Sequence, residues 1–185
     1  MPNYIKNRLI INGSKEQVEE VKNFLKPKEP THWENQEESV AMDFNNITPT
    51  PKWVYQGKLG IKEEQKYGKE NCWYEWRCNN WGTKWNAFRS SESGNIIEFE
   101  TAWCGVPDLI RKLSIIFPNV EFEYFYADED IGHNAGHFKF KDFEPFNYFI
   151  ISGSKESYEL AFELWGCEDD YIWNEKNQEY EWKDE

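Results

Sequence analysis

Apolar and polar residues alternate at the start of the chain and predict a β-strand over residues 3–13, NYIKNRLIING. A helix is expected next, because Ser14 and Gln17 have the spacing of a capping box and Pro27 marks the end of the pattern. The apolar residues of this helix recur three and four positions apart, as one buried helical face requires: Val18, Val21 and Leu25. The first unit is therefore a strand followed by a helix.

A second strand is expected over residues 39–47, SVAMDFNNI, where apolar side chains alternate until Pro49 and Pro51 end the run. The next segment, residues 52–94, carries charges, glycines and five tryptophans, and it shows only a short helical stretch around residues 73–78. We interpret this segment as a long insertion between the second and third strands.

The strand pattern resumes over residues 95–103, NIIEFETAW, and a helix that Pro107 opens ends at Pro118, before a fourth strand over residues 120–127, VEFEYFYA. One face of the third strand is expected to be buried: Ile97, Phe99, Thr101 and Trp103. The resulting order is βαββαβ. With right-handed crossovers, this order gives an antiparallel four-stranded sheet with two helices on one face, the ferredoxin-like α+β fold.

The last third of the chain predicts a β/α extension. Two strands separated by Pro145 precede a helix that begins at Ser154, and residues 171–182 alternate around a turn, as in an exposed acidic hairpin. Residues 150–156, IISGSKE, resemble residues 10–16, IINGSKE. We interpret this match as two uses of one strand-to-helix connection, since a single short match does not establish a duplication.

These patterns divide the chain of 185 residues into two parts. Residues 1–145 form a ferredoxin-like domain that carries the insertion over about residues 52–94. Residues 146–185 form a C-terminal extension that packs on this domain and ends in an acidic tail. Aromatic residues make up 18% of the chain, so rings must supply much of the buried area.

Charge and cysteine content narrow the partners and the compartment. The formal charge is −13 and the 21 Lys and Arg do not cluster in the sequence, so we expect a partner protein with a basic surface and not a nucleic acid. The four cysteines include no CxxC pair and no secretory leader precedes Asn3, which favours a reducing cytoplasm. No apolar stretch approaches the ~20 residues that cross a bilayer, so no membrane association is expected.

Several motifs, in this order, resemble the YubB-type ferredoxin-like family: MPNYIKNRLIING, DFNNITPTP, NWGTKWNAF, FETAW and LSIIFPNVEFEYFYADEDIGHNAG. The resemblance covers about residues 1–140. It implies the ferredoxin-like fold and an origin in phages, plasmids or genomic islands, and it implies no particular reaction. One departure follows the TAW motif, where Cys104 to Pro107 replace a Ser-Pro-rich turn of similar members, although the start of the helix is kept.

The densest candidate site is NWGTKWNA, residues 80–87. In a functional interpretation Gly82 lets the backbone approach a ligand, two tryptophans stack on a base, a sugar or an aromatic side chain, and polar residues donate hydrogen bonds. In the alternative, which we favour, both tryptophans plug the core, Gly82 forms a left-handed turn, and a polar rim remains. The candidate binding residues are Trp81, Gly82, Thr83, Lys84, Trp85 and Asn86.

The loop ADEDIGHNAGH, residues 127–137, spaces Asp128, Asp130 and Asn134 like the oxygen ligands of a calcium loop. It lacks the bidentate glutamate that closes such a loop, and its glycines break the helix that would align its two histidines. We therefore expect an acidic turn without a metal ion. A metal-dependent enzyme that uses residues 128–137 is kept as an alternative function.

No catalytic constellation emerges, because the sequence contains no G-x-S-x-G elbow, P-loop or GxGxxG motif. Two acidic clusters are candidate binding residues instead: Asp128, Glu129 and Asp130, and Glu168, Asp169 and Asp170. We expect a non-enzymatic protein without a cofactor that binds a host protein, such as a defence or nucleic-acid-processing factor. A second alternative is a module that binds single-stranded nucleic acid or a small ligand on its aromatic face.

Overall fold

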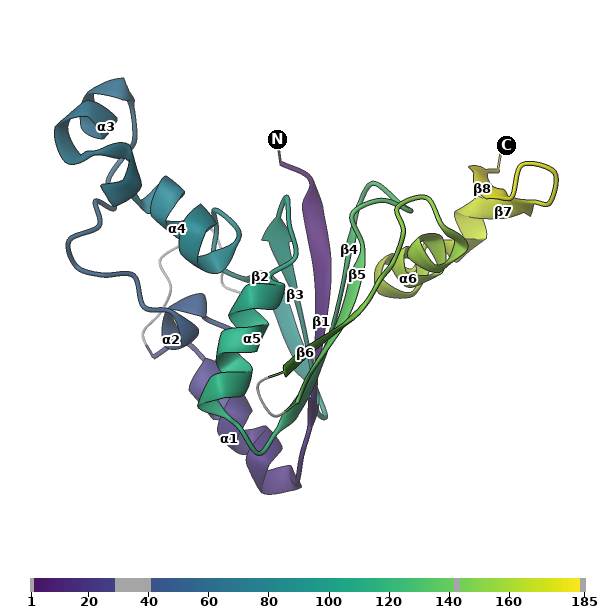
Figure 1. The fold of residues 1–185 in the computed structure, drawn as a ribbon, viewed down its shortest axis with the longest axis horizontal. Helices are drawn as coiled ribbons and strands as arrows, with labels where there is room; N and C mark the ends of the chain where they lie inside the picture. Colours follow the sequence, from purple (N-terminus) through teal and green to yellow (C-terminus); the bar gives the residue numbers. More distant parts are fainter. Residues whose placement is uncertain (1, 29–40, 142–143, 184–185) are drawn as a thin grey trace.

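The computed structural model describes residues 2–28, 41–141 and 144–183. In this part of the chain the main sheet has six antiparallel strands in the order β2–β3–β1–β4–β5–β6 (Figure 1). Its strands are β1 (Tyr4–Asn12), β2 (Phe88–Ser93), β3 (Ile96–Ala102), β4 (Glu121–Asp128), β5 (Gly136–Lys141) and β6 (Glu144–Tyr148). No helix among the described residues is long and apolar enough to span a bilayer.

The first four strands form the ferredoxin-like arrangement that the sequence predicted. Strand β1 lies between β3 and β4, and it is antiparallel to both. Helices α1 (Lys15–Leu25) and α5 (Pro107–Ile116) cover the same face of the sheet (Figure 1). The predicted capping box at the start of α1 is confirmed, because the Gln17 N–H donates to Ser14 Oγ at 3.3 Å and the Ser14 N–H donates to Gln17 Oε1 at 2.7 Å.

The core lies between this face of the sheet and the two helices. Alternate residues of β1, among them Leu9 and Ile11, are fully buried against the apolar faces of α1 and α5. Much of the remaining core consists of rings, as the composition indicated. These buried rings are Phe44, Trp76, Trp81, Phe99, Phe122, Tyr124 and Phe140.

The predicted strand over residues 39–47 is wrong where the structure describes it. Residues 41–43 belong to no element and the short helix α2 (Phe44–Ile47) follows, while residues 39–40 lie outside the described residues. Two side chains impose the helical turn: Asp43 Oδ1 accepts from the Asn45 N–H at 2.9 Å, and Asn86 Oδ1 accepts from the Phe44 N–H at 2.8 Å. The alternation of apolar residues in this segment therefore reflects burial of a backbone that is not a strand.

The second strand of the ferredoxin-like unit is β2, which reads FRSSES and is mostly exposed at the edge of the sheet. The insertion therefore lies between α1 and β2, and not between the second and third strands, since only Gly94 and Asn95 separate β2 from β3. Besides α2 it contains α3 (Ile61–Tyr67), the 3₁₀-helix η1 (Lys69–Asn71) and α4 (Trp73–Trp81). Helix α4 confirms and extends the helical stretch predicted around residues 73–78.

Two smaller expectations are also corrected. Trp103 does not share the buried face of β3, because the strand ends at Ala102 and Trp103 is 39% exposed with a φ of 72°. Pro145 does not separate two strands but lies inside β6, an edge strand in which a missing N–H is tolerated. Residues 149–152 belong to no strand, so the connection before the last helix differs from that of residues 10–16.

The opposite face of the sheet is covered in part by helix α6 (Lys155–Trp165), which Ser154 caps as predicted (Figure 1). Helix α6 buries Leu160, Ala161 and Leu164 against Ala127 of β4. The 3₁₀-helix η2 (Glu168–Asp170) follows, and then the predicted hairpin of β7 (Tyr171–Asn174) and β8 (Glu179–Trp182). The C-terminal elements thus lie on the side of the sheet away from α1 and α5.

Candidate functional site

The motif at residues 80–87 divides into buried and outward-facing parts. Trp81 is 1% exposed, donates from Nε1 to Thr48 O at 2.9 Å and packs edge-on against Phe44. Thr83 and Asn86 are also buried, and Thr83 Oγ1 donates to the Ala102 carbonyl at 2.8 Å. Thr83 thus anchors the end of the insertion to β3, whereas Trp81 and Asn86 hold it to α2 and its flanking residues. The burial of all three favours the core interpretation for them.

The outward-facing part of the motif is a cation held by two indoles. Gly82 ends α4 with a φ of 83°, a left-handed turn as predicted. Lys84 Nζ then lies 4.0 Å from the ring centroid of Trp85 and 4.0 Å from that of Trp103. Burial lowers the pKa of the Lys84 ammonium. Trp85 is half-buried, so it forms part of the polar rim and is not a plug of the core.

The acidic loop after β4 uses its first carboxylate internally. Asp128 is 5% exposed and accepts hydrogen bonds from Asn3 Nδ2, the Asp130 N–H and Asn134 Nδ2, at 3.1, 2.9 and 2.8 Å. The two histidines of the loop face different partners, Ser152 for His133 and Glu123 for His137. In the described ranges, no group of three His, Cys, Asp or Glu is arranged to hold a metal ion.

Residues from both predicted acidic clusters meet in one pocket of about 240 Å³. Glu129 comes from the loop after β4, and Asp170 comes from η2, which follows α6. We call this pocket the acidic–aromatic pocket; its lining is Glu129, Ile131, Trp165, Cys167, Asp170, Tyr171 and Trp182. Four members of the clusters lie outside this lining: Asp128 is buried, and Asp130, Glu168 and Asp169 are exposed.

The rings of the acidic–aromatic pocket are held in defined positions. Trp165 Nε1 donates to the Ala127 carbonyl at 3.1 Å, and Tyr171 packs edge-on against Trp182 with ring centroids 5.0 Å apart. Lys6 already lies over the Trp165 ring, 5.3 Å from its centroid. Burial raises the pKa of the Tyr171 hydroxyl, which is therefore neutral at physiological pH.

The two carboxylates of the pocket carry uncompensated charge. Glu129 Oε1 accepts from the Tyr4 N–H at 3.0 Å, and neither Glu129 nor Asp170 forms an ion pair with any described residue. Burial raises the pKa of the Cys167 thiol, so this side chain adds no further charge at neutral pH. Aromatic surface beside unpaired carboxylates suits a cationic group that also has an apolar stem.

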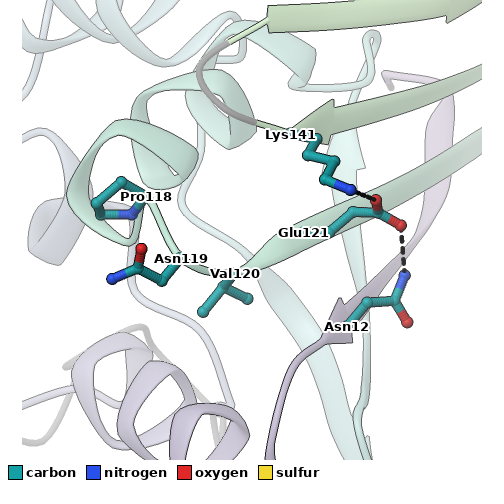
Figure 2. Close-up of a pocket in the computed structure, with 6 residues that line it drawn as sticks. All are labelled: Asn12, Pro118, Asn119, Val120, Glu121 and Lys141. Atoms are coloured by element: carbon teal, nitrogen blue, oxygen red, sulfur yellow. Dashed lines mark hydrogen bonds and ion pairs between the residues drawn. The ribbon is translucent and has the colours of Figure 1, made fainter.

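A larger hollow, of about 480 Å³, lies where β1 ends and β4 begins. Figure 2 shows Lys141 and Asn12 directed at Glu121. The Glu121 carboxylate pairs with Lys139 at 3.4 Å and Lys141 at 3.9 Å, and accepts from Asn12 Nδ2 at 3.5 Å. The charge of Glu121 is thus compensated within the protein. This hollow therefore offers a partner less unpaired charge than the acidic–aromatic pocket does.

Sequence reasoning missed the aromatic half of the pocket. Trp165 and Tyr171 stand on either side of the EDD cluster at residues 168–170, and Trp182 ends the hairpin. This flanking of an acidic run by rings is a signal in the sequence. That the rings converge on Glu129 depends on the packing of α6 across the sheet, which the local pattern does not contain.

The strand order β2–β3–β1–β4, with both connecting helices on one face, defines a ferredoxin-like α+β protein. The family model of the ferredoxin-like domain in Api92-like protein matches residues 80–185, more than half of the chain. The chain therefore belongs to this Api92-like family. The matched range contains every residue of the acidic–aromatic pocket, including the C-terminal elements that lay outside the motif resemblance over residues 1–140.

A solved structure is also similar to this chain. The crystal structure of a protein Api92 from Yersinia pseudotuberculosis has 10% sequence identity and a TM-score of 0.45, and the alignment covers 82% of this chain and 99% of that chain. The curated proteins contain no match.

Proposed function

We propose that this chain is a non-enzymatic binding protein whose acidic–aromatic pocket accepts a lysine or arginine side chain of a host protein. The observation that carries the proposal is the presence of Glu129 and Asp170 in one pocket with Trp165, Tyr171 and Trp182. A long basic side chain fits both features, because its hydrocarbon stem packs on rings while its charge pairs with carboxylates.

The charge around the pocket supports a basic partner. Residues 150–185 contain 11 Asp and Glu against 3 Lys. Such a field raises the rate of encounter with a basic surface, and the rings at its centre supply specificity. Screening by salt weakens the attraction between exposed charges, so binding is expected to weaken as the ionic strength rises.

The motif resemblance to YubB-type proteins of phages, plasmids and genomic islands supports a host protein as the partner. Products of such elements meet the defence and nucleic-acid-processing proteins of the cell that carries them. Those proteins have basic grooves for DNA or RNA, and an acidic protein can occupy such a groove. We therefore propose a cytoplasmic factor of this kind as the partner.

The test separates the pocket from general acidity. A fluorescein-labelled oligoarginine peptide of about eight residues is titrated with the protein, and fluorescence anisotropy reports the affinity. The variant Glu129→Gln/Asp170→Asn removes both pocket carboxylates. The control variant Glu168→Gln/Asp169→Asn removes the same charge from neighbouring exposed positions.

The pocket variant is expected to weaken binding about tenfold or more, because a close ion pair with the peptide is lost at each carboxylate. The control is expected to change binding about twofold, because it alters only the long-range field. Equal losses in the two variants would show that charge alone binds the peptide, and the pocket would then have no specific role. Pull-down from a host lysate with the same two variants extends the comparison to the natural partner.

A further inference from the structure

Charge is distributed unevenly over this acidic protein. Residues 44–87, from the start of α2 to the residue before β2, contain seven Lys and Arg against four Asp and Glu, whereas the whole chain contains 21 against 34. We call this segment the helical lobe; it holds α2, α3, η1 and α4. The helical lobe and the acidic hairpin β7–β8 lie on opposite sides of the main sheet (Figure 1). The average charge of the sequence therefore conceals a region of positive charge.

The positive charges of the helical lobe face solvent. Five lysines are exposed: Lys52, Lys58, Lys62, Lys66 and Lys69. Of the four carboxylates in the lobe, only Glu70 is exposed, and the others are half-buried. Lys69 pairs with Glu75 at 3.4 Å, and within the described residues the other four lysines form no ion pair. The outer surface of the lobe thus presents unpaired ammonium groups.

Flat aromatic side chains accompany these lysines. Trp53 is 62% exposed and makes no ring contact with any described residue. Tyr67 is 38% exposed and stacks on Tyr55 with ring centroids 4.4 Å apart, and Lys66 Nζ lies 4.8 Å from the Tyr67 centroid. Helix α3, which carries Tyr67, has no buried residue. Packing of the core therefore does not account for these rings.

The same pairing of cation and ring recurs at the end of the lobe. Lys84 lies between Trp85 and Trp103 and forms no ion pair with a described residue. Trp103 is 39% exposed and is held there by a left-handed backbone, with a φ of 72°. Ammonium groups beside exposed rings thus occur at both Tyr67 and Trp103.

We propose that the helical lobe binds single-stranded nucleic acid. Proteins that hold single strands without reading their sequence combine cations that follow the backbone with aromatic faces on which bases stack. The lobe offers both, with Lys52, Lys58 and Lys62 for phosphates and Trp53 for a base. An acidic polypeptide would use the lysines but would leave the exposed indole without a partner. A duplex keeps its bases stacked inside, so it would also lack the ring contact.

The experiment measures the anisotropy of a fluorescein-labelled oligothymidylate of about 20 nucleotides at about 50 mM salt, with a duplex of the same length alongside. The lobe variant is Lys58→Glu/Lys62→Glu. The matched control is Lys15→Glu/Lys176→Glu, which reverses two exposed lysines outside the lobe and changes the net charge equally. Trp53→Ala tests stacking, and unlabelled poly-L-glutamate tests for a general polyanion site.

The lobe variant is expected to weaken binding of the single strand about tenfold or more, and the control about twofold or less, because only the lobe contacts phosphates. Trp53→Ala is expected to weaken it about fivefold or more, because a stacked base is lost. Four outcomes would each overturn the inference. The first two are equal losses of affinity in the lobe variant and the control, and no binding of the single strand by the unmodified protein. The other two are an affinity for the duplex equal to that for the single strand, and competition by poly-L-glutamate as strong as that by an unlabelled single strand. The oligoarginine titration concerns a different surface, so either proposal can fail without the other.

Discussion

The Tyr124 hydroxyl donates a hydrogen bond to Asn7 Oδ1 at 2.5 Å and so joins strands β4 and β1 inside the core. Both side chains are fully buried. The same hydroxyl accepts from the Val106 N–H at 2.7 Å, immediately before α5, and Asn7 Nδ2 donates to Thr101 Oγ1 at 3.0 Å. One polar network therefore links the two central strands to β3 and to the start of α5, and it fixes their mutual register.

Tyr124→Phe is expected to lower the free energy of unfolding by about 1–3 kcal/mol, because Asn7 Oδ1 and the Val106 N–H remain buried without this partner. Chemical denaturation followed by circular dichroism measures the change. The control is Tyr148→Phe, since Tyr148 is 38% exposed and its hydroxyl forms no hydrogen bond with a described residue. If both variants lowered the free energy of unfolding by the same small amount, the hydrogen-bond network would not stabilise the protein.

The stability that the buried tyrosines contribute is expected to fall as the pH rises above about 10. Burial raises the pKa of the Tyr124 hydroxyl well above the ordinary value of 10.0, and burial also raises the pKa of Tyr126. The unfolded chain thus loses these protons at a lower pH than the folded protein, and every proton lost from the unfolded state alone favours unfolding. Denaturation at several pH values between about 9 and 11 should show a shallower fall for Tyr124→Phe than for the unmodified protein. If the stability of the two proteins fell equally with pH, the fall could not be assigned to Tyr124.

The two tryptophans of residues 80–87 are expected to differ in their effect on stability. Trp81→Ala should cost about 3–5 kcal/mol, because it leaves a cavity beside Phe44 and Trp76. Trp85→Ala should cost about 1 kcal/mol, because it removes an edge contact with Phe88 and one ring face from Lys84. Thermal and chemical denaturation of both variants measure the difference, and a loss for Trp85→Ala as large as that for Trp81→Ala would place both rings in the core.

Much of the ferredoxin-like unit could be predicted from the sequence, because its buried elements have strong periodicity. Strand β1, helix α1 and helix α5 follow apolar spacings bounded by caps and prolines. Strand β2 could not be found in this way, since FRSSES lies at the edge of the sheet and has no buried residue. Residues 41–44 gave the opposite error, a predicted strand where none exists, because they are buried without forming a strand.

The candidate site was only half predictable for a related reason. Charged residues such as Glu129 and Asp170 stand out in a sequence, but their meeting depends on how α6 crosses the sheet. Lys84 lies beside Trp85 in the sequence, whereas its second ring, Trp103, comes directly after the end of β3. Contacts between distant segments therefore account for what the sequence did not show.

Asp128 and Asp130 are expected to have different effects although both belong to the predicted acidic cluster. Asp128→Ala should lower the free energy of unfolding by about 1–3 kcal/mol, because the amides of Asn3 and Asn134 lose a buried acceptor. Asp130→Ala, at an exposed position, should change it by less than about 0.5 kcal/mol. Chemical denaturation of the two variants provides the comparison. Equal stability would mean that Asp128 does not support the loop after β4.

Two exposed tryptophans on opposite sides of the sheet are expected to serve different ligands. Trp182 is 61% exposed and lines the acidic–aromatic pocket, and Trp53 is 62% exposed on the helical lobe. Because neither ring belongs to the core, both alanine variants should keep the stability of the unmodified protein within about 1 kcal/mol. Trp182→Ala should weaken binding of the oligoarginine peptide about fivefold and leave binding of the oligothymidylate unchanged, since it removes one ring that packs on a basic side chain. Trp53→Ala should weaken binding of the oligothymidylate about fivefold or more and leave binding of the oligoarginine peptide unchanged. If either variant weakened both ligands equally, the two surfaces would not act separately, and one shared mode of binding would have to replace the two proposed here.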